Sequence, residues 1–262
     1  MKLMPTQEDL EMPPSEKSAE QMMQELVYAV SHDMGASVRA MMGFADLRNR
    51  RYSERLDDDG RNFLKLMSKG AIDLQAQIDG LLAFSRVTSR GRPLLETSTA
   101  DVWRSVLDAK SQLLSEINAV VDYSDLPNVM ADASQLTQLL TELLDNTIKF
   151  RRDEPLKIHF SADSDSTESA RRDGHRTFRM TDNGRGVANQ HLERVFQLYQ
   201  RLCPEVPGNG VGLAICQRII QRHGGVIWAE SEIGRGTSIR FTLPVAPSKS
   251  HEHPSLCEAI TE

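Results

Sequence analysis

The sequence lacks the features that define several large classes of protein. None of its apolar runs approaches the ~18 residues that a membrane-spanning helix needs, and its start, MKLMPTQEDLEMPP, contains no signal-peptide core. Its 3 cysteines are too few and too scattered for a disulfide framework or a zinc site, which favours a reducing cytoplasm. The net charge of −6 argues against general affinity for nucleic acid. We therefore expect a cytoplasmic protein with no nucleic-acid partner and no direct membrane insertion.

The first third of the chain has the apolar spacing of two long helices. Apolar residues recur every three or four positions between residues 19 and 51, at Met23, Val27, Val30, Met34, Val38, Met41 and Ala45. After a predicted turn at 57–60 the same spacing returns at Met67, Ala71, Leu74, Ile78, Leu81 and Phe84. This predicts a helical hairpin over 19–90. A homodimer that closes into a four-helix bundle would bury both seams.

The rest of the chain has a mixed pattern, and the fold class predicted for the whole is α+β. Residues 1–18 carry three prolines and read as a disordered lead-in, while 247–262 read as a flexible tail. Ser89–Pro93 breaks the helical pattern and predicts a hinge, after which a second domain spans 91–246. Its periodicity predicts helices near 99–116, 133–150 and 211–223 and strands near 119–123, 156–161, 176–182, 226–231 and 237–243. A long loop is predicted at 161–174.

His32 is a candidate phosphoryl acceptor on the first helix. A helix turns about 100° per residue, so His32 falls about 200° from Val30, opposite the apolar stripe. Its imidazole should therefore face solvent, where a neutral ring nitrogen can accept a phosphoryl group near pH 7. The carboxylate of Asp33 could orient the ring or take its proton. A lone exposed histidine is otherwise an ordinary surface residue.

Three later motifs are candidates for one nucleotide site. LTELLDNTIKF places Glu142, Asn146 and Lys149 on one helix face, with oxygen ligands for Mg²⁺ and a cation for phosphate. Alone, such a row is also the polar face of an ordinary helix. In MTDNGRGV, Asp182 ends a predicted strand and could accept a hydrogen bond from an exocyclic amine such as that of adenine. The DNG sequence alone is equally typical of a turn.

The third motif, GNGVGLAIC, combines Gly208, Gly210, Val211, Gly212 and Leu213 at a helix start, where free N–H groups favour phosphate. It is not the dinucleotide fingerprint, because a loop precedes it, and the chain has no GxxxxGK[ST] phosphate loop. A further glycine pair, in IGRGTSIRF, brings Thr237 to the start of the last strand as a small hydrogen-bonding residue. Each motif is ambiguous alone, but their joint occurrence in this order indicates one nucleotide site.

Over residues 20–245 the sequence resembles the sensor histidine kinases of two-component signalling. The H box is SHDMGASVR, the N box LLDNTIKF, the first glycine box DNGRGV, the F box VFQLYQRL and the second glycine box GNGVGLA. LLAFSRV, DNTIKF and the short loop before GNGVG resemble the kinase module of phytochrome-related kinases. The resemblance implies a dimeric phosphoacceptor hairpin followed by an α/β sandwich ATP-binding domain with a mixed sheet, of the gyrase, chaperone and histidine kinase superfamily.

The resemblance also implies roles for individual residues. His32 would be phosphorylated from ATP with Asp33 as its acid/base partner, and the phosphoryl group would pass to an aspartate in the receiver domain of a response regulator. Because residues 1–18 are too short for a sensor domain, input would come from a missing region, from a partner such as a separate sensor protein, or from nothing. The residues implied for the ATP and Mg²⁺ site are Asn146 for the metal, Lys149 for a phosphate, Asp182 for adenine, Gly184, Gly186, Gly208, Gly210 and Gly212 for its shape, and Phe196 and Tyr199 for the lid.

Four positions depart from the family pattern. Ser37 replaces a proline that bends the helix in relatives, so the helix is expected to run straighter here. Gly35 replaces a residue that is often basic. Ala36 replaces the Thr or Asn of members that dephosphorylate their regulator, which predicts weak phosphatase activity. Glu142, a candidate metal ligand and catalytic residue, stands where many members have asparagine. A glutamate at this position is typical of the ATP hydrolases of the superfamily, where it activates water.

Three functions are therefore open from the sequence. The leading one is an active histidine autokinase. The second is a dimeric scaffold that binds ATP or a regulator without efficient transfer, which the unusual H box suggests. The third is an ATP hydrolase or a kinase of protein serine, against which His32 and Asp33 argue because a hydrolase needs no acceptor histidine.

Overall fold

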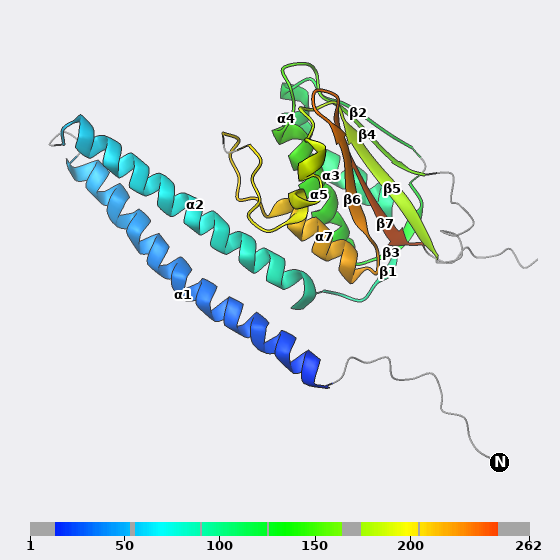
Figure 1. Ribbon diagram of the computed structural model, residues 1–262, viewed down its shortest axis with the longest axis horizontal. Coiled ribbons are helices and arrows are strands. Elements are labelled where there is room, and N and C mark those ends of the chain that lie inside the picture. The colour runs from blue at the N-terminus through cyan, green and yellow to red at the C-terminus, as the bar shows by residue number, and fades with distance from the viewer. Residues whose placement is uncertain are drawn as a thin grey trace, which may run out of the picture.

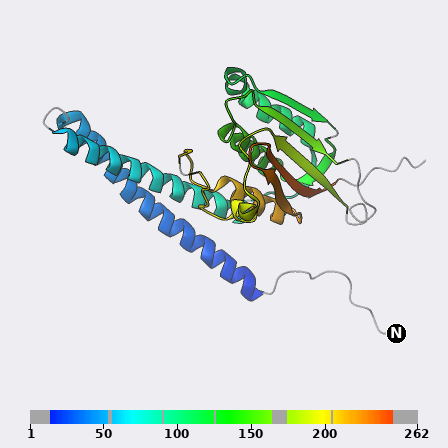
Figure 2. The same cartoon turned by 45° about the horizontal axis from the view of Figure 1, so that its top comes forward.

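The computed structural model describes residues 14–52, 56–89, 91–124, 126–163, 174–203 and 205–245. Two long helices, α1 (Pro14–Tyr52) and α2 (Asp58–Ser89), lie side by side as an antiparallel hairpin that extends from a body of sheet and shorter helices (Figures 1 and 2). The predicted hairpin is confirmed. Within the described ranges, no helix is both long enough and apolar enough to cross a membrane.

The ends of the hairpin helices differ from their predicted positions. α1 begins at Pro14 rather than at residue 19, because proline is well suited to the first turn of a helix. The predicted turn at 57–60 lies mostly inside α2, since Asp57 Oδ1 accepts a 2.8 Å hydrogen bond from the Gly60 N–H and caps the helix. The predicted lead-in before Pro14, most of the loop at 161–174 and the tail at 247–262 lie outside the described residues.

α2 covers only one side of the apolar stripe of α1. Val38 is 2% exposed and Ser31 is also buried, on the side of α1 that packs against α2. In contrast, Val30 is 45% exposed, Met34 is 44% exposed and Met41 is 57% exposed. The hairpin of one chain therefore leaves part of its apolar surface open.

A mixed five-stranded sheet forms the centre of the second part of the chain. The strand order is β2-β4-β5-β7-β6, in which β2 pairs parallel to β4 and the other neighbours pair antiparallel. These strands span Val120–Ser124 (β2), Lys157–Ala162 (β4), His175–Asp182 (β5), Ile227–Glu232 (β6) and Gly236–Pro244 (β7). All five predicted strands are therefore confirmed, and the fold is α+β as predicted.

Helices cover one face of this sheet (Figure 1). They are α3 (Thr99–Ala109), α4 (Ser111–Glu116), α5 (Ala133–Lys149) and α7 (Gly212–Arg222), with 3-10 turns η2 (Asn189–His191) and η3 (Arg194–Phe196). The predicted single helix at 99–116 is wrong in one detail: it is interrupted at Lys110, which has φ −110° and ψ 7°. The side chain of Lys110 reaches across to α5 and pairs with Asp145 at 2.6 Å.

The sequence pattern missed a small second sheet. β1 (Leu95–Ser98) and β3 (Asn128–Ala131) pair antiparallel, and Thr97 Oγ1 donates a 3.2 Å hydrogen bond to the carbonyl oxygen of Ala131. Each strand has four residues, which is too short to show a clear period of two.

Aromatic side chains fix the helices to the sheet. Phe160, Phe178 and Phe241 come from three adjacent strands, are fully buried and stack with ring centroids 5.4–6.3 Å apart. Trp103 of α3 packs edge-on against Phe160 at 5.1 Å. α5 adds five buried leucines to this core: Leu136, Leu139, Leu140, Leu143 and Leu144. This anchoring fixes the face of α5 that carries the predicted site residues.

Candidate ATP-binding site

The first half of the site is a row of polar side chains along α5. Asp132 caps the helix, with Oδ1 accepting from the N–H groups of Ser134 at 3.0 Å and Gln135 at 3.3 Å. The buried leucines hold one face of α5 against the sheet. Glu142, Asn146 and Lys149 follow the neighbouring face and are each partly buried. The predicted spacing of these three residues is therefore realised on a helix that cannot rotate freely.

The glycine-rich segment 208–212 lies directly against this row. Gly212 comes so close that a Cβ atom there would lie 2.5 Å from Glu142 Oε2 and 3.7 Å from Asn146 Nδ2. Gly208 packs against the ammonium group of Lys149. Gly210 has φ +68°, a conformation that favours glycine. The structure thus brings the second glycine box and the N box together.

Burial changes the acid–base properties of this half of the site. It raises the pKa of the Glu142 carboxyl, and the nearby charge of Asp145 raises it further. Burial also lowers the pKa of the Lys149 ammonium, with a further contribution from the Arg201 cation. A bound phosphate chain would supply the negative charge that Lys149 and Arg201 face together.

Asn146 provides a test of whether the site suits a nucleotide and its metal. The buried Asn146 Nδ2 has no hydrogen-bond partner among the described residues. An unpartnered buried amide is costly, and the oxygen and nitrogen of an amide can exchange places by rotation. Together with the carboxylate of Glu142, Asn146 offers the oxygen donors that Mg²⁺ prefers when it also carries phosphates. The donor groups of Asn146 and Glu142 therefore fit the binding of Mg²⁺ and ATP that the sequence predicts.

The second half of the site lies at the end of β5. Asp182 Oδ1 accepts hydrogen bonds from the backbone N–H groups of Gly184 at 2.7 Å and Thr237 at 3.2 Å. Within the described ranges no donor reaches Oδ2, so this oxygen can accept from a ligand. Burial raises the pKa of Asp182, and the two backbone hydrogen bonds oppose that rise. The side chain of Thr237 hydrogen-bonds Ser231 Oγ at 3.0 Å.

The end of α5 joins the two halves. The carbonyl oxygen of Phe150 accepts a 3.0 Å hydrogen bond from the N–H of Arg185. A Cβ atom on Gly184 would lie 2.8 Å from the same oxygen, so only glycine fits there. Gly186 has φ +74° and packs against the carbonyl of Glu232. The first glycine box is therefore locked between α5 and the β6–β7 turn.

The F-box residues lie in the segment between β5 and α7. Phe196 is buried in η3, which packs against α7. Tyr199 has φ +60°, is 41% exposed, and donates a 3.3 Å hydrogen bond to the carbonyl oxygen of Gln77 on α2. Val211 is 1% exposed and Leu213 packs against the core. Phe196 anchors this segment to the body, whereas Tyr199 connects it to the hairpin.

The predicted phosphoacceptor segment lies on α1. His32 is within this helix, but its side chain lies outside the described residues. Asp33 and Ala36 are exposed. α1 is unbroken through Ser37, whose Oγ donates a 3.1 Å hydrogen bond to the carbonyl of Asp33.

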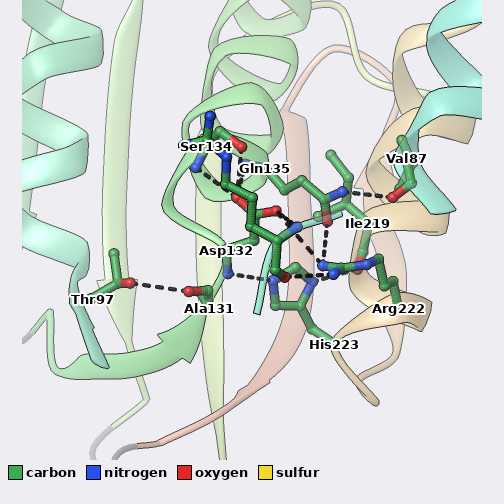
Figure 3. A network of polar contacts seen from close by, with 10 residues as sticks. Val87, Thr97, Ala131, Asp132, Ser134, Gln135, Ile219, Arg222 and His223 are labelled. Atoms are coloured by element: carbon green, nitrogen blue, oxygen red, sulfur yellow. Dashed lines mark hydrogen bonds and ion pairs between the residues drawn. The ribbon is translucent and has the colours of Figure 1, made fainter. Parts of the chain in front are cut away.

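Sequence reasoning missed a polar network where the hairpin meets the body (Figure 3). His223 Nε2 accepts from the Asp132 N–H at 3.1 Å, and Arg222 donates to Gln135 Oε1 at 2.9 Å. Gln135 Nε2 in turn donates to the Val87 carbonyl at the end of α2 at 2.6 Å. No local pattern signals these contacts, because their partners lie far apart in the sequence.

Comparison with known proteins agrees with this geometry. Residues 131–247 match the family described as histidine kinase-, DNA gyrase B-, and HSP90-like ATPase. Cyanobacterial phytochrome A of Nostoc is 34% identical over 225 residues, which is 85% of this chain and 28% of the relative. The methanogenesis regulatory histidine kinase FilI of Methanothrix harundinacea is 34% identical over 87% of this chain and 25% of its own length.

A solved structure shares the fold. Histidine kinase ThkA, in complex with the response regulator protein TrrA, matches with a TM-score of 0.60 and 19% identity over 90% of this chain and 66% of that chain. The chain spans less than a third of the length of the two relatives, at 28% and 25%. The sequence, the site and these matches agree that the chain belongs to the sensor histidine kinases and contains their ATPase domain.

Proposed function

We propose that the chain transfers the γ-phosphoryl group of ATP to His32 and then to an aspartate in the receiver domain of a response regulator. The observation that carries the proposal is a hydrogen bond from Arg185 to the carbonyl oxygen of Phe150, which connects the two halves of the site. One half holds Asp182, which can accept from adenine, and the other is the row of polar side chains on α5 that faces phosphate. The same chain supplies a histidine on a separate helical hairpin. A donor site and an acceptor in one chain are the parts that autophosphorylation requires.

In the proposed reaction the chain acts mainly by positioning and by neutralising charge. Asp182 Oδ2 accepts a hydrogen bond from the adenine amine. Asn146 and Glu142 would hold Mg²⁺, which would supply positive charge to neutralise the phosphates. Lys149 contacts a phosphate oxygen. A ring nitrogen of His32 forms the new bond to phosphorus as the bond to the β–γ bridging oxygen breaks, and ADP leaves with that electron pair. Asp33 orients the ring and holds its proton.

A homodimer is part of the proposal. The apolar residues that α2 leaves open on α1 continue onto α2, where several large side chains are also exposed. These open residues are Val30, Met34, Met41, Phe44, Phe63, Leu66 and Met67. A second hairpin packed on this face would complete a four-helix bundle and remove the apolar surface from water.

A cytoplasmic location and an input from outside this sequence complete the proposal. Three scattered cysteines suit a reducing compartment. The related ThkA was solved with a response regulator, which supports the same class of partner here.

Incubation with γ-labelled ATP and Mg²⁺ tests the proposal. We expect a label on the protein that is stable to alkali and labile to acid, as for phosphohistidine, and that is lost in His32→Gln. Asp33→Asn should retain nucleotide binding but label more slowly. ATP turnover that His32→Gln leaves unchanged would instead indicate a hydrolase, and bound nucleotide without label or turnover would indicate a scaffold.

A further inference from the structure

The glycine-rich loop of the ATP site is docked on α2 through contacts that the proposed function does not use. Asn209 lies between two site glycines, and its Nδ2 donates a 3.0 Å hydrogen bond to the carbonyl oxygen of Ala76. Tyr199, at the start of the same segment, donates to the next carbonyl oxygen, that of Gln77. Both views show the yellow segment of the chain lying against α2 (Figures 1 and 2).

Gly80 forms the surface on which this loop rests. A Cβ atom on Gly80 would lie 2.6 Å from Val211 Cγ2 and 3.0 Å from Asn209 Nδ2. Val211 cannot easily move aside, because it is 1% exposed and its branched side chain has few rotamers. Its N–H is also held by Asn209 Oδ1 at 3.2 Å. The absence of a side chain at Gly80 is therefore what permits this close contact.

The docking contact lies at the height of the acceptor histidine along the hairpin. Gly35 of α1 lies beside the side chain of Gln75 of α2, since a Cβ atom on Gly35 would lie 3.7 Å from Gln75 Nε2. That Nε2 reaches along α2 and donates a 3.0 Å hydrogen bond to Asp79 Oδ1, so the level of Gly35 on α2 lies between Gln75 and Asp79. The two helices are antiparallel and rise equally per residue, so three residues back from Gly35 corresponds to three residues further along α2. The backbone of His32 is thus level with the turn of α2 over residues 78–82, which contains Gly80.

We propose that Gly80 and Asn209 are positioning residues, which dock the phosphate-facing loop on α2 at the level of His32 and so align donor and acceptor for phosphoryl transfer. This inference rests on the proposed autokinase function. The loop that docks also contacts the phosphate-facing row, through Gly208 at Lys149 and Gly212 at Glu142. A displacement of the loop from α2 therefore moves the donor end of the site relative to the hairpin.

Gly80→Ala in the full chain tests the inference, with Gly70→Ala as its matched control. Both changes replace a glycine inside α2 by the best helix former, but Gly70 is exposed and has no neighbour within 4 Å of an added Cβ. The added methyl at Gly80 must push the loop away by about 1 Å. A misplacement of that size lowers a transfer rate by about 10- to 100-fold.

We expect the single-turnover rate of His32 phosphorylation at saturating ATP to fall by this factor in Gly80→Ala and to stay unchanged in Gly70→Ala. The affinity for a fluorescent ADP analogue should remain unchanged in both. Hydrogen exchange of the amides at 205–212 should be faster in Gly80→Ala alone, because the loop is no longer held.

The outcomes separate the two hypotheses. Absence of His32-dependent label in the unmodified protein would refute the proposed function, and the positioning role with it. Label in the unmodified protein, with an equal or higher rate in Gly80→Ala, would refute the positioning role alone. A parallel loss of nucleotide affinity in Gly80→Ala would also overturn the inference, since the glycine would then act on binding.

Discussion

The backbone N–H of Asp132 donates a hydrogen bond to Nε2 of His223 (Figure 3). The ring nitrogen on the other side, Nδ1, lies 2.7 Å from the carbonyl oxygen of Ile219, to which it must donate. His223 is therefore neutral in the fold, with its proton on Nδ1. Burial lowers the pKa of His223, and the Arg222 cation beside it contributes to the same shift.

The first prediction is a pH-dependent stability that arises from His223. Its pKa in the folded state lies below that of the unfolded chain, about 6.5, so the unfolded state takes up protons first as the pH falls. We expect the contribution of His223 to be complete above pH ~6.5 and to be lost as the pH falls toward the folded pKa, by less than about 1.4 kcal/mol per pH unit. Urea unfolding between pH 7.5 and pH 5 measures this loss.

His223→Gln should lower the stability at pH 7.5 and make the stability less dependent on pH over this range. His159→Gln is the control, because the ring of His159 lies at the surface beside Asp122. Equal slopes in the unmodified protein and His223→Gln would show that other groups cause the pH dependence.

The second prediction concerns adenine recognition by Asp182. Asp182→Asn should weaken ADP binding by about 10- to 100-fold, since a hydrogen bond to a charged group contributes about 1.5–3 kcal/mol. Burial raises the pKa of Asp182, so its carboxyl becomes protonated at a higher pH than that of an ordinary aspartate. The affinity for ADP should therefore fall as the pH drops toward this pKa. Titration calorimetry at several pH values measures this loss of affinity, which should be absent in Asp182→Asn.

The third prediction concerns Ala36, which is exposed on α1 and cannot hydrogen-bond a water molecule. We expect the protein to remove phosphate only slowly from a receiver domain that it has phosphorylated. Ala36→Thr should accelerate this step by up to about tenfold, through one added hydrogen bond to the attacking water. Rapid dephosphorylation that depends on this protein and that Ala36→Thr leaves unchanged would contradict the prediction.

The fourth prediction tests the open apolar face of the hairpin. Phe44 is 73% exposed in one chain, and Leu66 on the facing helix is 66% exposed. Phe44→Glu should raise the dimer dissociation constant by at least about 100-fold. The dimer loses two Phe44 side chains, one from each chain, and each contributes about 1.5–3 kcal/mol when buried. Sedimentation velocity measures the change. Lys65→Glu, an exposed charge reversal on α2, should leave the dimer intact, and monomers in the unmodified protein would refute the homodimer.

The secondary structure was largely predictable because its patterns are local. The repeats of three and four in α1 and α2 and the short apolar runs of the five strands require only neighbouring residues. The interruption at Lys110 was not predictable, because the sequence around it contains no proline or glycine to signal it. β1 and β3 were missed because four residues each are too few to show a clear period of two.

The polar residues of the site could be predicted from the sequence, but the contacts of its loop with α2 could not. Asn146, Lys149 and Asp182 stand out because polar residues interrupt an apolar pattern. The structure places Asn146 and Lys149 beside the glycine-rich loop and Asp182 at the end of β5, where it holds Gly184. The contact of Asn209 with α2 could not be predicted, since it joins residues 133 positions apart. Gly80 gave no signal either, because a helix glycine has the same appearance in the sequence whether its surroundings are open or filled.

The hydrogen bond from Arg185 to Phe150 ties both ends of the site to one rigid rod. Asn146 lies in the last turn of α5 and Phe150 directly follows the helix, four residues on, which corresponds to about 6 Å along the helix axis. The spacing between base and phosphate sites is thus set by helix geometry and cannot stretch to suit a longer or shorter ligand.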